Sequence, residues 1–173
     1  CVRYGNVVGS RGSVVPIFIR QRETGKLTIT DERMTRFWLS LEQGVAFVID
    51  SIERMQGGEV FVPKLPSTTI PDLAAAIAPD AEIEVIGIRP GEKLHEVMIG
   101  EDAARLTIEL DDFFVVQPSE ALWFGREWEE KGQRLDEGFR YASNTNPERL
   151  TVAQIRAIVA PIEAALAGES TQA

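Results

Sequence analysis

The chain has 173 residues, one cysteine and a formal net charge of −9 at pH 7, so it is about one domain long and can bury an ordinary core. One cysteine excludes an internal disulfide and fits a reducing compartment, while the acidic majority argues against nucleic acid, whose phosphates call for a broad basic surface. The uninterrupted apolar runs, such as 45–49, are far shorter than the ~20 residues that span a bilayer.

The first elements suggest that the sequence starts inside a sheet. It begins without methionine, on a segment at 2–9 that reads as a buried strand running into a glycine loop. We therefore expect a piece of a longer protein, with an earlier part of the same sheet missing. A helix that ends near Gly25 and a short strand at 27–30 follow.

The next predicted helix runs from Ser40 to about Met55. Ser40 and Gln43 have the spacing of a capping box. Apolar side chains then recur at helical spacing, at Leu41, Val45, Val48 and Ile52. Beyond this helix, residues 59–65 alternate as a strand, and a helix is predicted from Thr69 to Pro79.

Residues 82–88 predict a further strand, with Ile83 and Val85 on one face. Residues 92–99 are predicted to be helical, and 113–118 to form a strand.

A last helix is predicted from Thr151, which again has a glutamine, Gln154, at capping-box spacing. Pro161 should bend it or make it restart. Residues 118–140 show no clear pattern. Helices and strands alternate throughout, which indicates the α/β class.

A glycine-rich stretch at 5–13 is the first with chemical interest, because it holds three glycines around Asn6 and Arg11. Glycines let backbone amides approach a bulky ligand, and asparagine both donates and accepts hydrogen bonds. The stretch matches neither the dinucleotide fingerprint nor a phosphate loop, so by itself a structural turn is the simpler interpretation.

Positive charge is concentrated near the start of the chain. Residues 1–36 carry seven basic and three acidic groups, hence +4, whereas 37–173 carry 11 basic and 24 acidic groups, hence −13, which together give −9. Such a region suits a small anion, and a solvated basic stretch explains the charge count equally well. Arg33 and Arg36 both belong to this region. Their expected partners are either phosphate oxygens or neighbouring carboxylates.

Arg89 stands on the turn Pro90-Gly91, which fixes its direction with little entropy left to lose. The single histidine, His95, follows six residues later. With no second histidine or cysteine cluster we predict no metal site. A helix-surface or capping role is favoured for His95 over a catalytic one.

Taken in order, four stretches resemble one family: 3–18, 27–38, 53–64 and 87–99. Together with 141–151 they resemble the C-terminal half of the extended short-chain dehydrogenases/reductases that act on nucleotide sugars. The closest likeness is to the inverting UDP-N-acetylglucosamine 4,6-dehydratases of pseudaminic acid biosynthesis, within the polysaccharide biosynthesis proteins. It runs from residue 1 to about 160 and leaves 118–140 without a function.

The resemblance implies that residues 1–173 contain the last strands of an NAD(P)-binding Rossmann-type extended fold, interleaved with a smaller α/β substrate-binding domain. The dinucleotide-binding half would be missing, and with it every catalytic residue. The family's Tyr-x-x-x-Lys pair is absent here, since Tyr4 and Tyr141 have no lysine four residues on.

The resemblance also implies ligands, NADP and a UDP-sugar. NADP would be lined at its nicotinamide end by Val7, Val8, Gly9, Ser10 and Arg11. Arg36 and Arg89 would clamp the diphosphate from two sides, and Glu92 would bind the ribose or support Arg89. Asn6 would also contact the substrate, and Ser13, Val14, Pro16 and Thr28 would lie near the uridine.

The activity implied is that of a lyase. The family oxidises the sugar at C4, removes a proton at C5, expels water from C6 and returns the hydride at C6 with inversion at C5. This chain alone would bind substrate without reacting. Two alternatives stay open: a UDP-N-acetylglucosamine 4-epimerase of the same superfamily, and a non-catalytic nucleotide-sugar-binding module. A cytoplasmic homo-oligomer is expected for the full-length protein.

Overall fold

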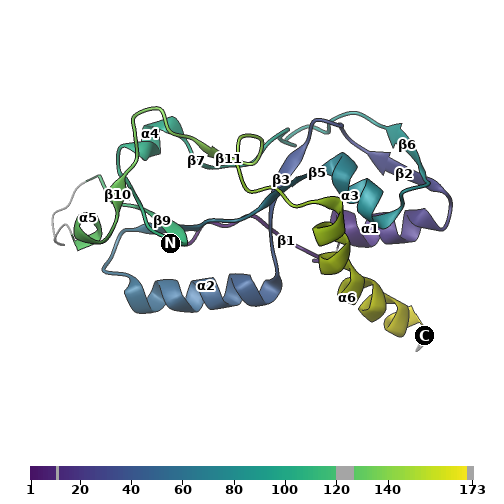
Figure 1. Ribbon diagram of the computed structural model, residues 1–173, viewed down its shortest axis with the longest axis horizontal. Helices are drawn as coiled ribbons and strands as arrows, with labels where there is room; N and C mark the ends of the chain where they lie inside the picture. Colours follow the sequence, from purple (N-terminus) through teal and green to yellow (C-terminus); the bar gives the residue numbers. More distant parts are fainter. Residues whose placement is uncertain (11, 120–126, 171–173) are drawn as a thin grey trace.

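A computed structural model describes residues 1–10, 12–119 and 127–170 (Figure 1). Helices and strands alternate along the chain, so the fold is mixed α/β. The helices are α1 (Val14–Arg22), α2 (Leu41–Arg54), α3 (Ile70–Ile77), α4 (Glu101–Ala104), α5 (Glu127–Lys131) and α6 (Val152–Ser170). The strands are β1 (Asn6–Val7), β2 (Lys26–Ile29), β3 (Thr35–Leu39), β4 (Val60–Pro63), β5 (Ser67–Thr69), β6 (Glu82–Val85), β7 (Val97–Ile99), β8 (Thr107–Glu109), β9 (Phe113–Val116), β10 (Gln133–Arg134) and β11 (Tyr141–Ala142).

The strands form four small sheets, in the orders β1-β3-β5, β10-β8-β9-β4, β11-β7 and β2-β6. The pairs β1/β3 and β2/β6 are parallel, and the other pairs are antiparallel. In Figure 1, α1, α3 and α6 gather with β2 and β6 at one end, while β8, β9 and β10 lie at the other. Strand β3 lies between the two ends.

Strand β3 contributes to two hydrophobic cores because successive side chains of a strand point to opposite faces. Trp38 packs into the core formed with α1, α3 and α6. Phe37 and Leu39 pack into the core that contains Val62 and Tyr141. The two ends of the molecule are therefore joined through the side chains of one strand.

Three helix starts confirm the predicted capping. Ser40 Oγ accepts from the Gln43 backbone N–H at 3.1 Å, and Gln43 Oε1 accepts from the Ser40 N–H at 2.8 Å. Thr69 Oγ1 accepts from the Asp72 N–H at 3.0 Å. The Thr151/Gln154 pair repeats the reciprocal bonds of the first pair. Helix α6 then runs through Pro161 as one element.

The predicted helix over 92–99 is wrong. The segment is irregular up to Glu96 and continues as strand β7, which pairs with β11. Its backbone groups bond to distant segments: the Leu94 carbonyl accepts from Thr35 N–H at 3.0 Å, and the Glu96 carbonyl from Ser143 N–H at 2.9 Å. These long-range bonds replace the local ones that a helix requires.

Two predicted apolar faces are exposed. The apolar side chains predicted to form one face of α2 are exposed to solvent: Leu41 is 61%, Val45 50% and Ile52 60% exposed. On β6, Ile83 and Val85 are 40% and 52% exposed, and the strand ends at Val85, short of the predicted residue 88.

The strand predicted over 2–9 is also shorter and less buried than expected. It forms only β1 and an isolated bridge between Val2 and Phe61. Tyr4, within the predicted span, is 43% exposed.

Tyr141 joins strand β11 to the loop after β4. Its hydroxyl accepts from the Leu65 N–H at 2.7 Å and donates to the Leu65 carbonyl at 3.1 Å. Its ring centroid lies 4.6 Å from that of Phe37. Burial raises the pKa of the Tyr141 hydroxyl to about 12, so it stays protonated and keeps both bonds.

We predict that Tyr141→Phe lowers the free energy of unfolding by about 1–3 kcal/mol, because the ring remains while the buried Leu65 N–H loses its acceptor. Urea unfolding measures the change. Tyr4→Phe is the matched control, since Tyr4 is 43% exposed, and it should change stability by less than ~0.5 kcal/mol. Equal effects of the two substitutions would contradict the prediction.

Candidate functional site

A cavity of about 330 Å³ opens where β1, β2, β3, the start of α1 and the turn at 86–92 meet. It collects nearly all of the residues that the sequence singled out as binding candidates. Those lining it are Asn6, Val7, Val8, Gly9, Ser10, Ser13, Val14, Thr28, Arg36, Arg89 and Glu92. Pro16 is buried on α1 and does not line the cavity, and Arg11 lies outside the described residues.

The alternation of β3 explains one wall of this cavity. Met34, Arg36 and Trp38 follow each other at every second position and all line it, whereas Thr35 and Phe37 face the other way. Met34 and Trp38 were not among the predicted site residues. If 34–39 is read as a strand, Met34 and Trp38 fall on the same face as Arg36, which is the signal that could have found them.

In the loop after β1, the backbone conformation and the close packing both require glycine at position 9. Gly9 has φ +76°, and a Cβ at this position would lie 2.9 Å from Ile162 Cδ1 on α6. Only glycine combines that backbone with so close a neighbour. The loop is fixed to β3 by the Val8 N–H, which donates to the Leu39 carbonyl at 3.0 Å. The backbone of the loop is thereby held at the cavity wall.

Ser13 presents an unused polar group at the cavity. It is the N-cap of α1, but its hydroxyl makes no capping bond. The Oγ atom is buried and has no hydrogen-bond partner among the described residues. A buried polar atom without a partner is uncommon and points to a group that the protein alone does not supply.

Thr28, by contrast, is engaged. Its hydroxyl accepts from Gln21 Nε2 at 2.8 Å, and its N–H donates to Gln21 Oε1 at 3.1 Å. These bonds join β2 to α1.

Arg36 lines the cavity, but most of its guanidinium N–H groups donate to acceptors within the protein. Its Nη1 donates to the carbonyls of Thr35 at 2.8 Å and Leu94 at 3.0 Å, and its Nη2 to that of Lys93 at 2.8 Å. Its Nε lies 3.7 Å from Glu96 Oε1. Arg36 therefore supplies positive charge to the wall while tying β3 to the segment 93–96.

Arg89 is held differently. The Glu92 carboxylate accepts from the Arg89 N–H at 3.0 Å, and the Glu92 N–H donates to the Arg89 carbonyl at 3.1 Å. Gly91 has φ +87°, which this tight turn requires. The Arg89 guanidinium itself has no hydrogen bond or ion pair with any residue that the structure describes. Glu92 thus supports the turn and leaves the Arg89 side chain available.

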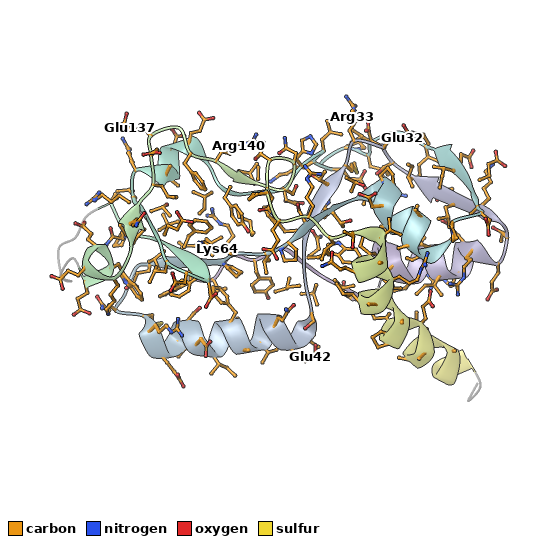
Figure 2. The ribbon with its side chains drawn as sticks, viewed as in Figure 1. Glu32, Arg33, Glu42, Lys64, Glu137 and Arg140 are labelled. Carbon is orange, nitrogen blue, oxygen red and sulfur yellow. The ribbon has the colours of Figure 1, made fainter. Side chains whose placement is uncertain are left out.

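Of the two kinds of partner expected for Arg33, phosphate oxygens or a neighbouring carboxylate, the structure shows a carboxylate. It forms a two-point ion pair with Asp31, with Nε to Oδ1 at 2.9 Å and Nη2 to Oδ2 at 2.7 Å. The pair lowers the pKa of Asp31 to about 2. Figure 2 shows Arg33 projecting outward at the edge of the molecule, and its side chain is 70% exposed. It does not line the cavity.

His95 lies beside the cavity without lining it. Its Nδ1 is 2.9 Å from Thr35 Oγ1, and because 92–96 is irregular, the expected position on a helix surface is wrong. Partial burial is the first cause that lowers the pKa of His95 below its ordinary 6.5, followed by nearby positive charges. These belong to Arg140, Arg36, Arg33 and Arg149.

The described residues hold no group of three or more histidine, cysteine, aspartate or glutamate side chains that could bind a metal ion. Within the same residues, none of the helices has the length and apolar character that a membrane crossing requires.

Fold and cavity together define a mixed α/β domain with a partly cationic binding cleft. Residues 1–118 match the family model described as "Polysaccharide biosynthesis protein". The chain therefore belongs to this family, as its motifs predicted.

Individual relatives agree with this family. The chain is 51% identical over 154 residues to UDP-N-acetylglucosamine 4,6-dehydratase (inverting) of Campylobacter jejuni, covering 84% of this chain and 46% of the relative. It is 37% identical to UDP-glucose 4-epimerase of Rickettsia canadensis, covering 92% and 48%. The solved structure of Pen from Bacillus thuringiensis superposes with a TM-score of 0.78 at 32% identity, covering 92% and 49%. The chain thus spans about half the length of the curated relatives it matches.

The lowered pKa of His95 predicts a pH dependence of stability. As pH falls below 6.5, the unfolded chain binds the proton first, so the folded state loses stability through this range and is fully stabilised above it. The Asp31 carboxylate, with a pKa of about 2, keeps its charge throughout.

The measurement is the unfolding midpoint between about pH 7.5 and about pH 5.5, compared with His95→Asn. The unmodified chain should lose more stability over this range than the variant. His95 is the only histidine of the chain, so equal losses would contradict the prediction.

Proposed function

We propose that this chain is the substrate-binding part of an NADP-dependent UDP-N-acetylglucosamine 4,6-dehydratase of the inverting type, a lyase of surface polysaccharide biosynthesis. The observation that carries the proposal is the cavity. It brings together the charge of Arg36 with two groups that have no partner in the part of the chain that the structure describes, the Arg89 guanidinium and the Ser13 hydroxyl. This set of groups suits a ligand with a diphosphate at one side and further polar groups at the other. The 51% identity to the Campylobacter enzyme supports the choice of substrate.

In this proposal each residue has a limited task. Arg89 binds the diphosphate directly, because its guanidinium has no partner among the described residues, and Arg36 adds positive charge from β3. Glu92 supports Arg89 through the turn, since its carboxylate already accepts from the Arg89 N–H. Ser13 offers its buried hydroxyl to the uridine side, and Asn6, the first residue of β1, faces the sugar.

The residues present also fit one end of a nicotinamide cofactor. Val7, Val8, Gly9 and Ser10 line the cavity with backbone that is fixed to β3 and α6. When bound, the cofactor accepts and returns the hydride. The loop would hold its nicotinamide end beside Asn6, and no catalytic side chain of this chain is assigned.

The proposed division of the protein follows from exposed apolar surface. We propose that a dinucleotide-binding half packs against α2 and β1, so that the described residues are the last strands of a Rossmann-type sheet with the smaller substrate-binding domain. The exposed row on α2 supports this, because its members are 50–61% exposed on one helix and monomeric surfaces rarely leave such patches open. They are Leu41, Val45, Ile49, Ile52 and Met55.

A second candidate activity is sugar-nucleotide epimerisation at C4, favoured by the 37% identity to UDP-glucose 4-epimerase over 92% of the chain. Incubation of the complete protein with UDP-N-acetylglucosamine, followed by mass analysis and NMR spectroscopy of the sugar, separates the two, since NMR distinguishes a C4 epimer from unreacted substrate of the same mass. A dehydratase product is lighter by one water because the C6 oxygen leaves as water. We expect that loss, whereas a C4 epimer of unchanged mass would establish the alternative.

For binding, we predict that Arg89→Ala in the complete protein weakens UDP affinity by about 1.5–3 kcal/mol, the range for a lost charge-assisted hydrogen bond. Isothermal titration calorimetry with UDP measures it. Arg36→Ala should also weaken binding.

Arg105→Ala is the matched control, because Arg105 is exposed at the end of α4, far from the cavity. It should leave UDP affinity unchanged. If Arg89→Ala and Arg105→Ala bind UDP equally well, Arg89 is not a diphosphate ligand.

A further inference from the structure

One group near the cavity has no task in the proposed function. His95 lies behind the wall, on the face of β3 opposite to Arg36, where it contacts Thr35. Thr35 and Ser143, the next member of this contact, are 4% and 0% exposed. Water therefore cannot readily replace the hydrogen bonds that they make.

The distances in this cluster define a chain of hydrogen bonds. Thr35 Oγ1 lies 2.9 Å from His95 Nδ1 and 2.6 Å from Ser143 Oγ. Ser143 Oγ donates to the Thr35 carbonyl at 3.1 Å and accepts from the Glu96 N–H at 2.9 Å. The cluster thus connects β3, the segment 95–96 and the residue after β11.

The number of protons fixes the direction of these bonds. A hydroxyl carries one proton. If Ser143 donates to the Thr35 carbonyl, the proton of Thr35 must go to Ser143, and Thr35 Oγ1 must then accept from His95 Nδ1–H. This arrangement satisfies all four contacts together. It requires a neutral His95 to carry its proton on Nδ1, with Nε2 as an acceptor.

The environment of the ring fits an acceptor at Nε2. Four guanidinium groups contribute positive charge at His95, and Figure 2 shows two of them, Arg33 and Arg140, along the same edge of the molecule. Glu96 and Asp31 are the carboxylates nearby.

The same segment is held from the other face of β3 as well. The Thr35 N–H and the Arg36 guanidinium bind the carbonyl of Leu94, and Arg36 also binds that of Lys93. The adjoining turn at 87–92 is exposed, and the hydrogen bonds that hold its Arg89–Glu92 part are its own. The turn that carries Arg89 is thus anchored at both ends: on one side by the Ile86 N–H, which donates to the Ile29 carbonyl at 2.8 Å, and on the other by residues 93–96 on β3.

We propose that His95 is a positioning residue: through Thr35 and Ser143 it anchors residues 93–96 on β3 and so places Arg89 at the cavity. The proposal rests on the proposed function of the cavity as a diphosphate site. It assigns His95 an effect on substrate affinity without contact to the substrate.

Three substitutions test the anchor in the complete protein. Asparagine places its amide nitrogen where Nδ1 lies, glutamine places it one bond farther out, and alanine removes it. We expect His95→Ala and His95→Gln to weaken UDP binding about threefold to tenfold, the effect of one hydrogen bond, and His95→Asn to stay within about twofold. NADP affinity should be unchanged in all three.

Coupling to Arg89 separates positioning from a general structural role. In an Arg89→Ala background, adding His95→Ala should cost less than about twofold in UDP affinity, because the group that it positions is gone. A full additional loss there, a loss of NADP affinity, or equal behaviour of His95→Asn and His95→Gln would overturn the proposal.

Two measurements need no ligand, so they keep this proposal distinct from the proposed function. Amide hydrogen exchange at 87–94 should be faster in His95→Ala than in the unmodified protein, and restored in His95→Asn. The ¹⁵N shifts of the His95 ring, assigned by its loss in His95→Asn, should show a protonated Nδ1 and a bare Nε2 near neutral pH. Unchanged exchange, or a proton on Nε2, would refute the anchor. Absence of UDP binding by the unmodified protein would instead refute the proposed function.

Discussion

The alternation of side chains along β3 is the constraint on which the rest of the structure depends. Because successive residues of a strand face opposite sides, Met34, Arg36 and Trp38 form a cavity wall while Thr35, Phe37 and Leu39 serve the other face. The residues that line the cavity and the residues that hold the fold together therefore alternate within the six residues 34–39. A shift of one residue in the register with β1, where Asn6 pairs with Trp38, would exchange the two faces completely.

The charged side chains described at this cavity are mostly positive, whereas the protein as a whole is negative. The chain carries −9 overall, yet among the described residues the charged side chains that line the cavity are Arg36, Arg89 and Glu92. The Glu92 carboxylate is held by the Arg89 backbone N–H, and Arg36 is held by carbonyl oxygens. Carbonyl partners leave a guanidinium its formal charge, whereas a two-point carboxylate pair, as for Arg33 and Asp31, offsets it. Arg36 has only the longer contact with Glu96, at 3.7 Å. Local pairing thus decides which arginines attract an anion.

Local chemistry could be predicted from the sequence where it acts over a few residues. The caps at Ser40, Thr69 and Thr151 formed because a side chain reaches a backbone N–H three residues on. The helix predicted over 92–99 was wrong because carbonyls of this segment bond to Thr35 and Ser143, far away in the sequence. Most cavity residues were found through family motifs. Trp38 could be found only from the alternation of faces along a strand. The three hydrogen bonds from Arg36 to backbone carbonyls cannot be read from residue types.

The cavity walls are ordered mainly by contacts that are remote in sequence. Ile162 on α6 leaves no room for a side chain at position 9, β3 binds the segment 93–94 that follows the Arg89 turn, and the residue after β11 binds β3. Ordering such segments costs conformational entropy, about 1–2 kcal/mol for each backbone residue fixed. A ligand that finds them already anchored does not have to supply that free energy. Substitutions on α6 or after β11 can therefore change affinity in the cavity without touching its lining.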